Sequence, residues 1–183
     1  MTNWLSRSEE ITSRIPKGFI FGAATSSWQI EGSSHLRGRS IWEDFADIPG
    51  KILDGAGADP ATDHFNRLEG DLDLLSNLGV DSYRLSVSWP RILPTGEGAV
   101  DQKGIDFYDR LIDGLLERNI KPALTLYHWD LPSALQAKGG WANKEIYEHF
   151  ENYADVLSHK FADRVFSWAT LNEPWVISYL GNA

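Results

Sequence analysis

Hydrophobic periodicity divides much of the chain into three helical segments. Apolar residues recur at helical spacing over residues 63–78, 101–118 and 144–160, which predicts amphipathic helices with one face toward a core. Gly79 directly follows the first segment, where a helix C-cap is expected. Each predicted helix is long enough to connect two neighbouring strands of a parallel sheet.

Four apolar runs of strand length alternate with these helices. They cover residues 19–24, 80–87, 122–127 and 165–171. The order is therefore βα, βα, βα, β, and right-handed crossovers of this kind produce a parallel sheet. Both a doubly wound sheet and a barrel fit the order. No Gly-x-Gly-x-x-Gly follows the first strand, which weakens the case for a dinucleotide site.

The remaining segments are polar and have little periodicity. Residues 1–17 are expected to be an irregular lead-in. Residues 32–62 are rich in Gly, Ser and Asp, with a possible turn around residues 42–45. A connection this long within a domain is usually functional. Neither repeats nor a composition shift divide the sequence, so residues 1–183 are predicted to form a single α/β domain.

Charge and cysteine content exclude several function classes. Seventeen Lys and Arg stand against twenty-six Asp and Glu, and the net charge of −9 argues against nucleic acid and anionic membranes as partners. The chain has no cysteine, which excludes disulfides, thiolate metal sites and cysteine nucleophiles. The first residues lack the features of a signal peptide, and no apolar run approaches the roughly 20 residues of a membrane span. A cytoplasmic protein is expected.

Polar and aromatic side chains follow each predicted strand. They are Trp28 and Gln29, Trp89, His128 and Trp129, and finally Asn172, Glu173 and Trp175. In a parallel barrel the carboxyl ends of the strands meet at one mouth, so these side chains are expected to lie together. Aromatic faces beside hydrogen-bonding groups suit sugar rings. Alone, Asn172-Glu173-Pro174 would also fit an exposed turn.

Four motifs in this order resemble glycoside hydrolase family 1, the β-glucosidase family. They are FIFGAATSSWQIEG at 19–32, YRLSVSWPRI at 83–92, YHWDLP at 127–132 and TLNEPW at 170–175. The resemblance implies a (β/α)8 TIM barrel, and four strands with three crossover helices match its N-terminal half. A doubly wound domain unrelated to sugars would require all four motifs to be coincidental.

The resemblance also assigns catalytic roles. Glu173 is expected to be the general acid/base, and Asn172 is expected to bind the sugar 2-hydroxyl. Arg84 matches the arginine beside the family's nucleophile. Its alternative is a structural ion pair with a helix, because a charge inside an apolar strand requires a partner.

Substrate-binding roles follow in the same way. Gln29 and His128 resemble ligands of the sugar 3- and 4-hydroxyls, with Trp129 lining the same subsite and Trp175 a platform for the leaving group. A core position for Trp129 fits almost equally well. The resemblance implies no cofactor, and His128 has no partner at metal-ligand spacing. The residues interpreted as structural are Glu31, Asp63, His64 and Asp130.

The family's nucleophile is a Glu in a Glu-Asn-Gly motif, which does not occur in this sequence. Two hypotheses follow. The chain is the N-terminal part of a truncated or split β-glucosidase acting on β-glucosyl, galactosyl or fucosyl residues. Alternatively, it is a non-catalytic half-barrel that binds sugar weakly or acts as an assembly module. The expected partners are a β-glucoside or cello-oligosaccharide and either a complementary C-terminal half-barrel or a second copy.

A half-barrel should expose two strand edges and an apolar inner sheet face. The candidates for that face are Phe19, Phe21, Leu124, Leu126, Phe166 and Trp168. Because parallel sheets are normally covered on both faces, this surface predicts a dimer or larger oligomer.

Overall fold

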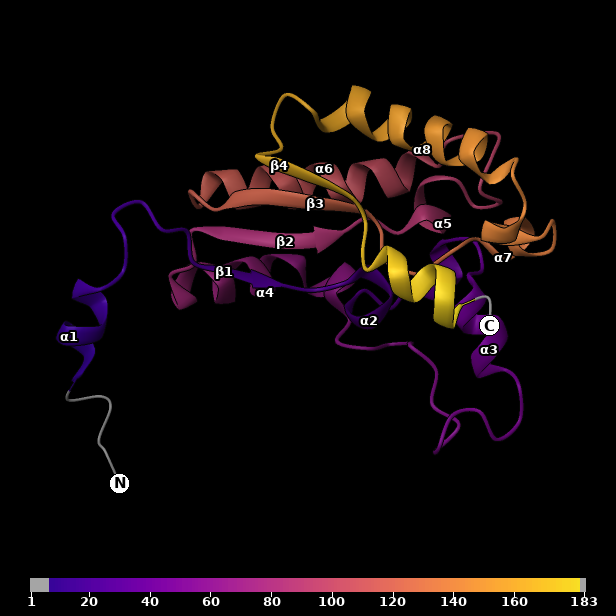
Figure 1. The fold of residues 1–183 in the computed structure, drawn as a ribbon, viewed down its shortest axis with the longest axis horizontal. Helices are drawn as coiled ribbons and strands as arrows, with labels where there is room; N and C mark the ends of the chain where they lie inside the picture. The colour runs from indigo at the N-terminus through magenta and orange to yellow at the C-terminus, as the bar shows by residue number, and fades with distance from the viewer. Residues whose placement is uncertain (1–6, 182–183) are drawn as a thin grey trace.

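Four parallel strands form one sheet in the order β1-β2-β3-β4 in the computed structural model, which describes residues 7–181 (Figure 1). The strands are β1 (Gly22–Ala24), β2 (Ser82–Ser86), β3 (Lys121–Tyr127) and β4 (Ser167–Leu171). Every neighbouring pair is parallel, with Arg84 opposite Ala123 and Ala123 opposite Ser167. The predicted parallel sheet is therefore confirmed, although β1 is shorter than expected.

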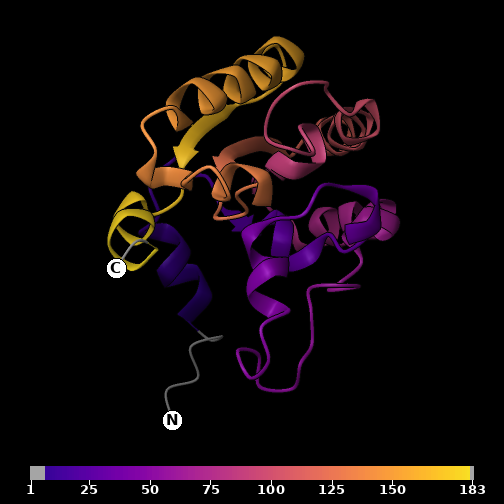
Figure 2. The ribbon, with the colours of Figure 1, turned by 90° about the vertical axis from the view of Figure 1, so that its right-hand side faces the viewer.

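Three long helices make the crossovers. They are α4 (His64–Leu78), α6 (Gln102–Glu117) and α8 (Ile146–Phe161), and each begins and ends within two residues of its predicted bounds. Viewed toward the carboxyl ends of the strands, the helices form an arc along one side of the sheet (Figure 2). Such an arc of helices outside parallel strands is the arrangement of an incomplete α/β barrel.

Shorter helices occupy the connections between these elements. They are α1 (Ser8–Ser13), α2 (Ser27–Ile30), η2 (Ser34–Leu36), α3 (Ile41–Ala46), α5 (Trp89–Ile92), α7 (Ser133–Gln136), η3 (Gly140–Ala142) and η4 (Val176–Leu180). The possible turn at 42–45 is the middle of α3. A capping box of Ser40 and Glu43 starts that helix by satisfying backbone N–H groups at its amino end.

The prediction of an irregular lead-in is wrong for Ser8–Ser13, which forms α1. Glu10 lies between Arg7 and Arg14 at helical spacing and pairs with both, at 2.8 and 2.6 Å. Such pairs three and four residues apart support a short helix. Residues 1–6 of the lead-in lie outside the described part of the chain.

The hydrophobic core lies between the sheet and the helices. Leu124 and Leu126 are only 1% and 6% exposed, so placing them on an open inner face was wrong. Strand side chains alternate between faces, and Leu126 borders a groove with Trp168 and residues of α8. The opposite face carries small or polar side chains, among them Ala123 and Thr125.

The two outer strands leave bulky residues in solvent. Phe19 and Phe21 beside β1, and Phe166 and Trp168 on the β4 side, are 36–55% exposed. Within the described residues β1 and β4 each pair with one neighbour only. Exposure of these four aromatic residues agrees with the prediction, but they mark the two edges of the sheet and not one continuous inner face.

A buried ion pair joins the segments that follow β1 and β2. Arg91 Nε donates to Glu31 Oε2 at 2.9 Å, and its Nη2 donates to the Gly32 carbonyl at 3.1 Å. Tyr108 of α6 donates its hydroxyl hydrogen to the other oxygen of Glu31. Burial and the Glu31 carboxylate together raise the pKa of Tyr108 well above its usual range. Tyr108 therefore stays protonated and remains a donor.

We expect Arg91→Met to lower the free energy of unfolding by about 3–5 kcal/mol, because Glu31 would stay buried without its cation. The matched control is Arg39→Met, which removes exposed pairs with Asp44 and Asp47 and should cost less than about 1 kcal/mol. Urea denaturation measures both. Equal losses in the two variants would contradict a structural role for the buried pair.

Candidate active site

Three strands contribute to one polar cluster at the carboxyl edge of the sheet. Arg84 of β2 donates from Nε to Thr125 Oγ1 at 2.9 Å and from Nη2 to Asn172 Oδ1 at 2.7 Å. The backbone N–H of Asn172 donates to the Tyr127 carbonyl at 2.9 Å. This last bond extends the pairing of β3 and β4 to the residue before Glu173.

Trp129 and Glu173 follow the ends of β3 and β4 with backbone in the left-handed region. Their φ angles are +73° and +47°, which costs a residue with a Cβ about 1–3 kcal/mol. The Trp129 indole N–H donates to the Asn172 carbonyl at 2.9 Å. This bond joins the two strand ends, and Trp129 is accordingly part of the cluster, with its side chain half-buried.

His128 lies beside Trp129, with ring centroids 5.3 Å apart. Burial and the nearby charge of Arg84 hold the pKa of His128 below its usual range, and the carboxylate of Glu173 partly opposes this effect. The imidazole is therefore neutral near pH 7 and offers one donor and one acceptor. These are the groups that a sugar hydroxyl needs.

Within the part of the chain that the structure describes, no carboxylate pairs with the charge of Arg84. Among residues 7–181, Arg84 makes hydrogen bonds but no ion pair, so the alternative of a structural ion pair with a helix is wrong. A half-buried guanidinium without a counter-ion is costly. The carboxyl edge of the sheet therefore presents a positive group that suits an anion.

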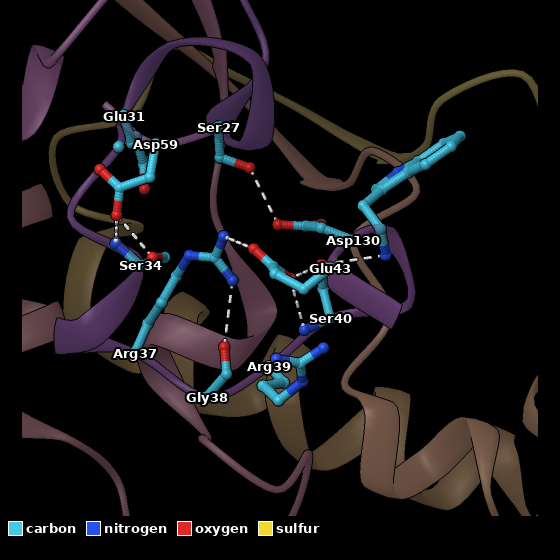
Figure 3. Close-up of polar contacts among 12 residues, drawn as sticks. Ser27, Glu31, Ser34, Arg37, Gly38, Arg39, Ser40, Glu43, Asp59 and Asp130 are labelled. Carbon is cyan, nitrogen blue, oxygen red and sulfur yellow. Dashed lines mark hydrogen bonds and ion pairs between the residues drawn. The ribbon is translucent and has the colours of Figure 1, made fainter. Parts of the chain in front are cut away.

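Gln29 lies on α2, after β1, with its side chain exposed and making no hydrogen bond to a described residue. Its neighbour Ser27 donates to Asp130 Oδ2 at 2.9 Å (Figure 3). Because Asp130 directly follows Trp129, this bond links the Gln29 segment to the end of β3. The structure thus places Gln29 on the same edge as the cluster without direct contact.

Figure 3 shows the polar contacts around this link. Arg37 pairs with Glu43 and also donates to the Gly38 carbonyl at 3.0 Å. Burial alone would raise the pKa of Glu43, but the pairing with Arg37 and the hydrogen bonds from Ser40 together outweigh it, so the pKa is lowered. The carboxylate consequently stays ionised and keeps both its pairing with Arg37 and its place in the capping box of α3.

Burial has the opposite effect on Asp130. It raises the pKa of Asp130 to about 6, against the hydrogen bond from Ser27 and the charge of Arg37. Asp130 is fully buried, and its Oδ1 has no hydrogen-bond partner among the described residues. The interpretation of Asp130 as structural fits this position, since Asp130 faces Ser27 inside the protein.

Trp175 lies outside the hydrogen-bonded cluster. It is 63% exposed and stacks on Tyr179 of η4, with centroids 5.1 Å apart. Beyond Trp129 an apolar cavity of about 320 Å³ opens between α3 and η4. Its lining includes Ile41, Trp42, Tyr127, Trp129, Trp141, Val176 and Leu180. This wall suits the hydrophobic part of a ligand, whereas the polar cluster suits hydroxyl groups.

Trp28 and Trp89 follow β1 and β2, a position that predicted rings available to a ligand. Both rings instead pack against other aromatic residues of the protein. Trp89 is fully buried and stacks on Tyr153, with centroids 4.8 Å apart. Trp28 lies against Trp42 of α3, with centroids 5.4 Å apart. Trp89 belongs to the core, because α5 turns it inward after β2.

The residues interpreted as structural have structural contacts. His64 is buried and its Nδ1 lies 2.6 Å from Asp71 Oδ2. Asp63 accepts a hydrogen bond from Asn66 at 2.6 Å in front of α4. The sequence reasoning overlooked Thr125, whose only signal was a hydroxyl inside an otherwise apolar strand.

The described residues contain no group of three or more His, Asp and Glu placed to hold a metal ion. Within the same part of the chain, none of the helices combines the length and hydrophobicity needed to cross a membrane.

Parallel strands with helices on one side define part of a (β/α)8 barrel, and a carboxylate beside amide, imidazole and indole groups suits a hydroxyl-rich ligand. The class of protein indicated is a carbohydrate-active α/β barrel. Sequence comparison gives the family: residues 11–183 match the profile described as Glycosyl hydrolase family 1, to which the chain belongs.

Its relatives include β-glucosidase A of Thermotoga maritima, 54% identical over 92% of this chain and 38% of the relative. β-Glucosidase 1B of Phanerodontia chrysosporium is 52% identical over 97% of the chain and 34% of that protein. The T. maritima β-glucosidase in complex with a methoxycarbonyl-substituted glucoimidazole superposes with a TM-score of 0.89 over 91% of this chain and 39% of the solved one. The chain thus spans well under half of these relatives, and its fold is the N-terminal half of the barrel.

Asp130 should give folding stability a distinctive pH dependence. Its folded-state pKa of about 6 exceeds the ordinary 3.8, so the folded protein holds this proton more tightly than the unfolded chain. The resulting stabilisation is complete below about pH 4 and is lost as the pH rises through about 6, by at most about 3 kcal/mol.

The measurement compares wild type with Asp130→Asn by urea denaturation between pH 4 and 7. As the pH rises, the free energy of unfolding of Asp130→Asn should increase relative to that of the wild type, because Asn carries no charge to bury. Asp163→Asn at an exposed position is the control. A difference that does not change with pH would show that Asp130 is ionised without penalty.

Proposed function

We propose that this chain is the acid/base half of a retaining β-glucosidase-type glycoside hydrolase. The observation that carries the proposal is the placement of Glu173 directly after Asn172, at a strand end held by Arg84 and Trp129. The fold and family membership support it, since barrel enzymes keep their chemistry at this edge.

Glu173 acts as general acid and then as general base. As an acid it protonates the departing glycosidic oxygen, and as a base it deprotonates the water that releases the sugar. Asn172 donates to the 2-hydroxyl, a contact that strengthens in the oxocarbenium-like transition state.

Gln29 and His128 bind the sugar 3- and 4-hydroxyls, and Trp129 lines the same subsite. Trp175 provides an aromatic platform for the leaving group. Its exposed ring beyond the polar cluster supports that role. The substrate class is a β-glucoside or cello-oligosaccharide, in line with the β-glucosidase names of the relatives. The cytoplasmic location expected from the sequence stays a prediction.

A retaining glycosidase needs a second carboxylate about 5–5.5 Å from the first, acting as nucleophile. We propose that another polypeptide segment supplies it, either a complementary C-terminal half-barrel or a second copy. The charge of Arg84, which has no carboxylate partner among residues 7–181, supports this proposal, because an incoming carboxylate beside Arg84 would satisfy both groups. The chain's coverage of only 38% of its relative is compatible with such a missing half.

The alternative is a non-catalytic half-barrel that binds sugar weakly or acts in assembly. A non-catalytic half-barrel would have the same fold and the same carboxyl edge of the sheet. This alternative predicts that no added polypeptide segment restores hydrolysis.

A complementation assay separates the two. The chain is mixed with the C-terminal part of T. maritima β-glucosidase A that follows the matched region, and hydrolysis of an aryl β-glucoside is recorded. The mixture should be active while each part alone shows at most a trace, because the two carboxylates act together. Glu173→Gln should lower the activity of the mixture by about 10²–10⁴-fold.

Glu117→Gln on the exposed end of α6 is the matched control and should leave activity unchanged. With Glu173→Ala, azide should partly restore turnover of activated substrates, because an anionic nucleophile needs no general base. Co-eluting but inactive halves, or equal activity of wild type and Glu173→Gln, would reject the acid/base role.

The exposed edges generate a further prediction about assembly. No described residue pairs with the outer edge of β1 or β4, and both edges lie beside exposed aromatic residues. Self-association should therefore bury several hundred Å² of apolar area, worth several kcal/mol at about 25 cal/mol per Å². Light scattering at micromolar concentration should therefore detect a dimer or larger species. The complementary half should disperse it. A monomer that binds no hydrophobic dye would contradict the exposed-edge argument.

A further inference from the structure

The side chain of Arg84 extends across the sheet toward the end of β4. It starts on β2, meets Thr125 on β3 at 2.9 Å and reaches Asn172 at 2.7 Å. Thr125 is 1% exposed, so its hydroxyl is shielded from water. A single guanidinium thus connects a buried hydroxyl to an amide beside the proposed acid/base.

Small side chains leave the space for this arrangement. Ala123 lies opposite Arg84 in the β2–β3 register, and Ala169 lies opposite Thr125 in the β3–β4 register. Side chains at one level of a parallel sheet point to the same face. A larger residue at either position would meet the Arg84 stem or its guanidinium.

The chemistry of the three groups fixes the orientation of the amide. A guanidinium has donors and no acceptor, so Asn172 must present Oδ1 to it. The Nδ2 group, with two donors, is then the part of the amide left for another ligand. Thr125 takes the Nε–H of Arg84 and so prevents the guanidinium from turning about its own stem. With Arg84 fixed, the Asn172 amide has one orientation.

We propose that Thr125 is a positioning residue that holds Asn172, through Arg84, as a hydrogen-bond donor toward a sugar hydroxyl. The inference rests on the proposed function, in which Asn172 meets the 2-hydroxyl. Thr125 does not touch the substrate. Valine has the same shape but no acceptor, and it would leave Nε of Arg84 unsatisfied and the guanidinium free to tilt.

The catalytic test compares two substrates in the complemented enzyme, an aryl β-glucoside and its 2-deoxy analogue. Thr125→Val should lower kcat/KM for the glucoside about ten- to thirtyfold and change the 2-deoxy substrate less than about threefold, since only the glucoside uses the donor of Asn172. Thr125→Ser, which keeps the hydroxyl, should restore the wild-type ratio. Thr170→Val at an exposed position of β4 is the matched control.

A second readout uses the chain alone and needs no activity. In wild type and Thr125→Ser, the Nε–H of Arg84 should exchange slowly with water by ¹⁵N NMR. In Thr125→Val it should exchange at least about tenfold faster. Circular dichroism verifies folding of each variant, and Thr125→Ala replaces the valine variant if that one does not fold.

Equal losses of kcat/KM on both substrates in Thr125→Val would overturn the proposal. So would an unchanged exchange rate of the Arg84 Nε–H in that variant, or a Thr125→Ser enzyme that does not restore the wild-type ratio of kcat/KM for the two substrates. An inactive wild-type mixture would count against the proposed function itself. In that case the exchange rates still decide whether Thr125 fixes Arg84.

Discussion

The buried pair of Glu31 and Arg91 determines how the first two βα units meet. Glu31 directly follows α2, which carries Gln29, and Arg91 lies on α5 after β2. With Tyr108 as an additional donor, the pair attaches the segment after β1 to α6. The position of Gln29 at the strand-end edge is therefore maintained from inside the protein by a charge pair that water does not reach.

The strand-end cluster also depends on the charge of Arg84. Arg84 and His128 lie close enough for the guanidinium to disfavour protonation of the imidazole. The guanidinium adds to the larger effect of burial, which keeps His128 neutral, and its own charge suits an anion at this edge. One side chain thus affects the protonation state of a proposed sugar ligand, the orientation of Asn172 and the affinity of this edge for an anion.

The sequence predicted the long elements well and the side-chain connections poorly. α4, α6 and α8 were found because their apolar residues repeat over four turns or more. α3 was predicted only as a possible turn around residues 42–45, because the helix is too short for periodicity and the capping box of Ser40 and Glu43 at its start was overlooked. The faces of Leu124 and Leu126 were misassigned because β3 is apolar on successive residues and its alternation is weak.

The participation of Thr125 could not be predicted for a different reason. Arg84 reaches it from the neighbouring strand, and such a contact depends on the register of β2 and β3, which could not be read from the nearly continuous apolar run of β3. Trp89 was predicted to lie at the barrel mouth but belongs to the core, because the turn into α5 directs its side chain inward. Its position after a strand therefore did not determine where its side chain points. Residues named from motifs, such as His128, Asn172 and Glu173, do lie on one edge, because parallel strands bring their ends together.

The strand order also has a consequence for how such a chain is made. Each strand after β1 pairs with the strand that precedes it in the chain, so every ladder joins strands that are consecutive in the sequence and separated by one long crossover helix and shorter helices. Pairing of this kind can proceed as the polypeptide leaves the ribosome, one βα unit at a time, without waiting for distant sequence. A protein with this topology can assemble its first units during synthesis and close its barrel afterwards.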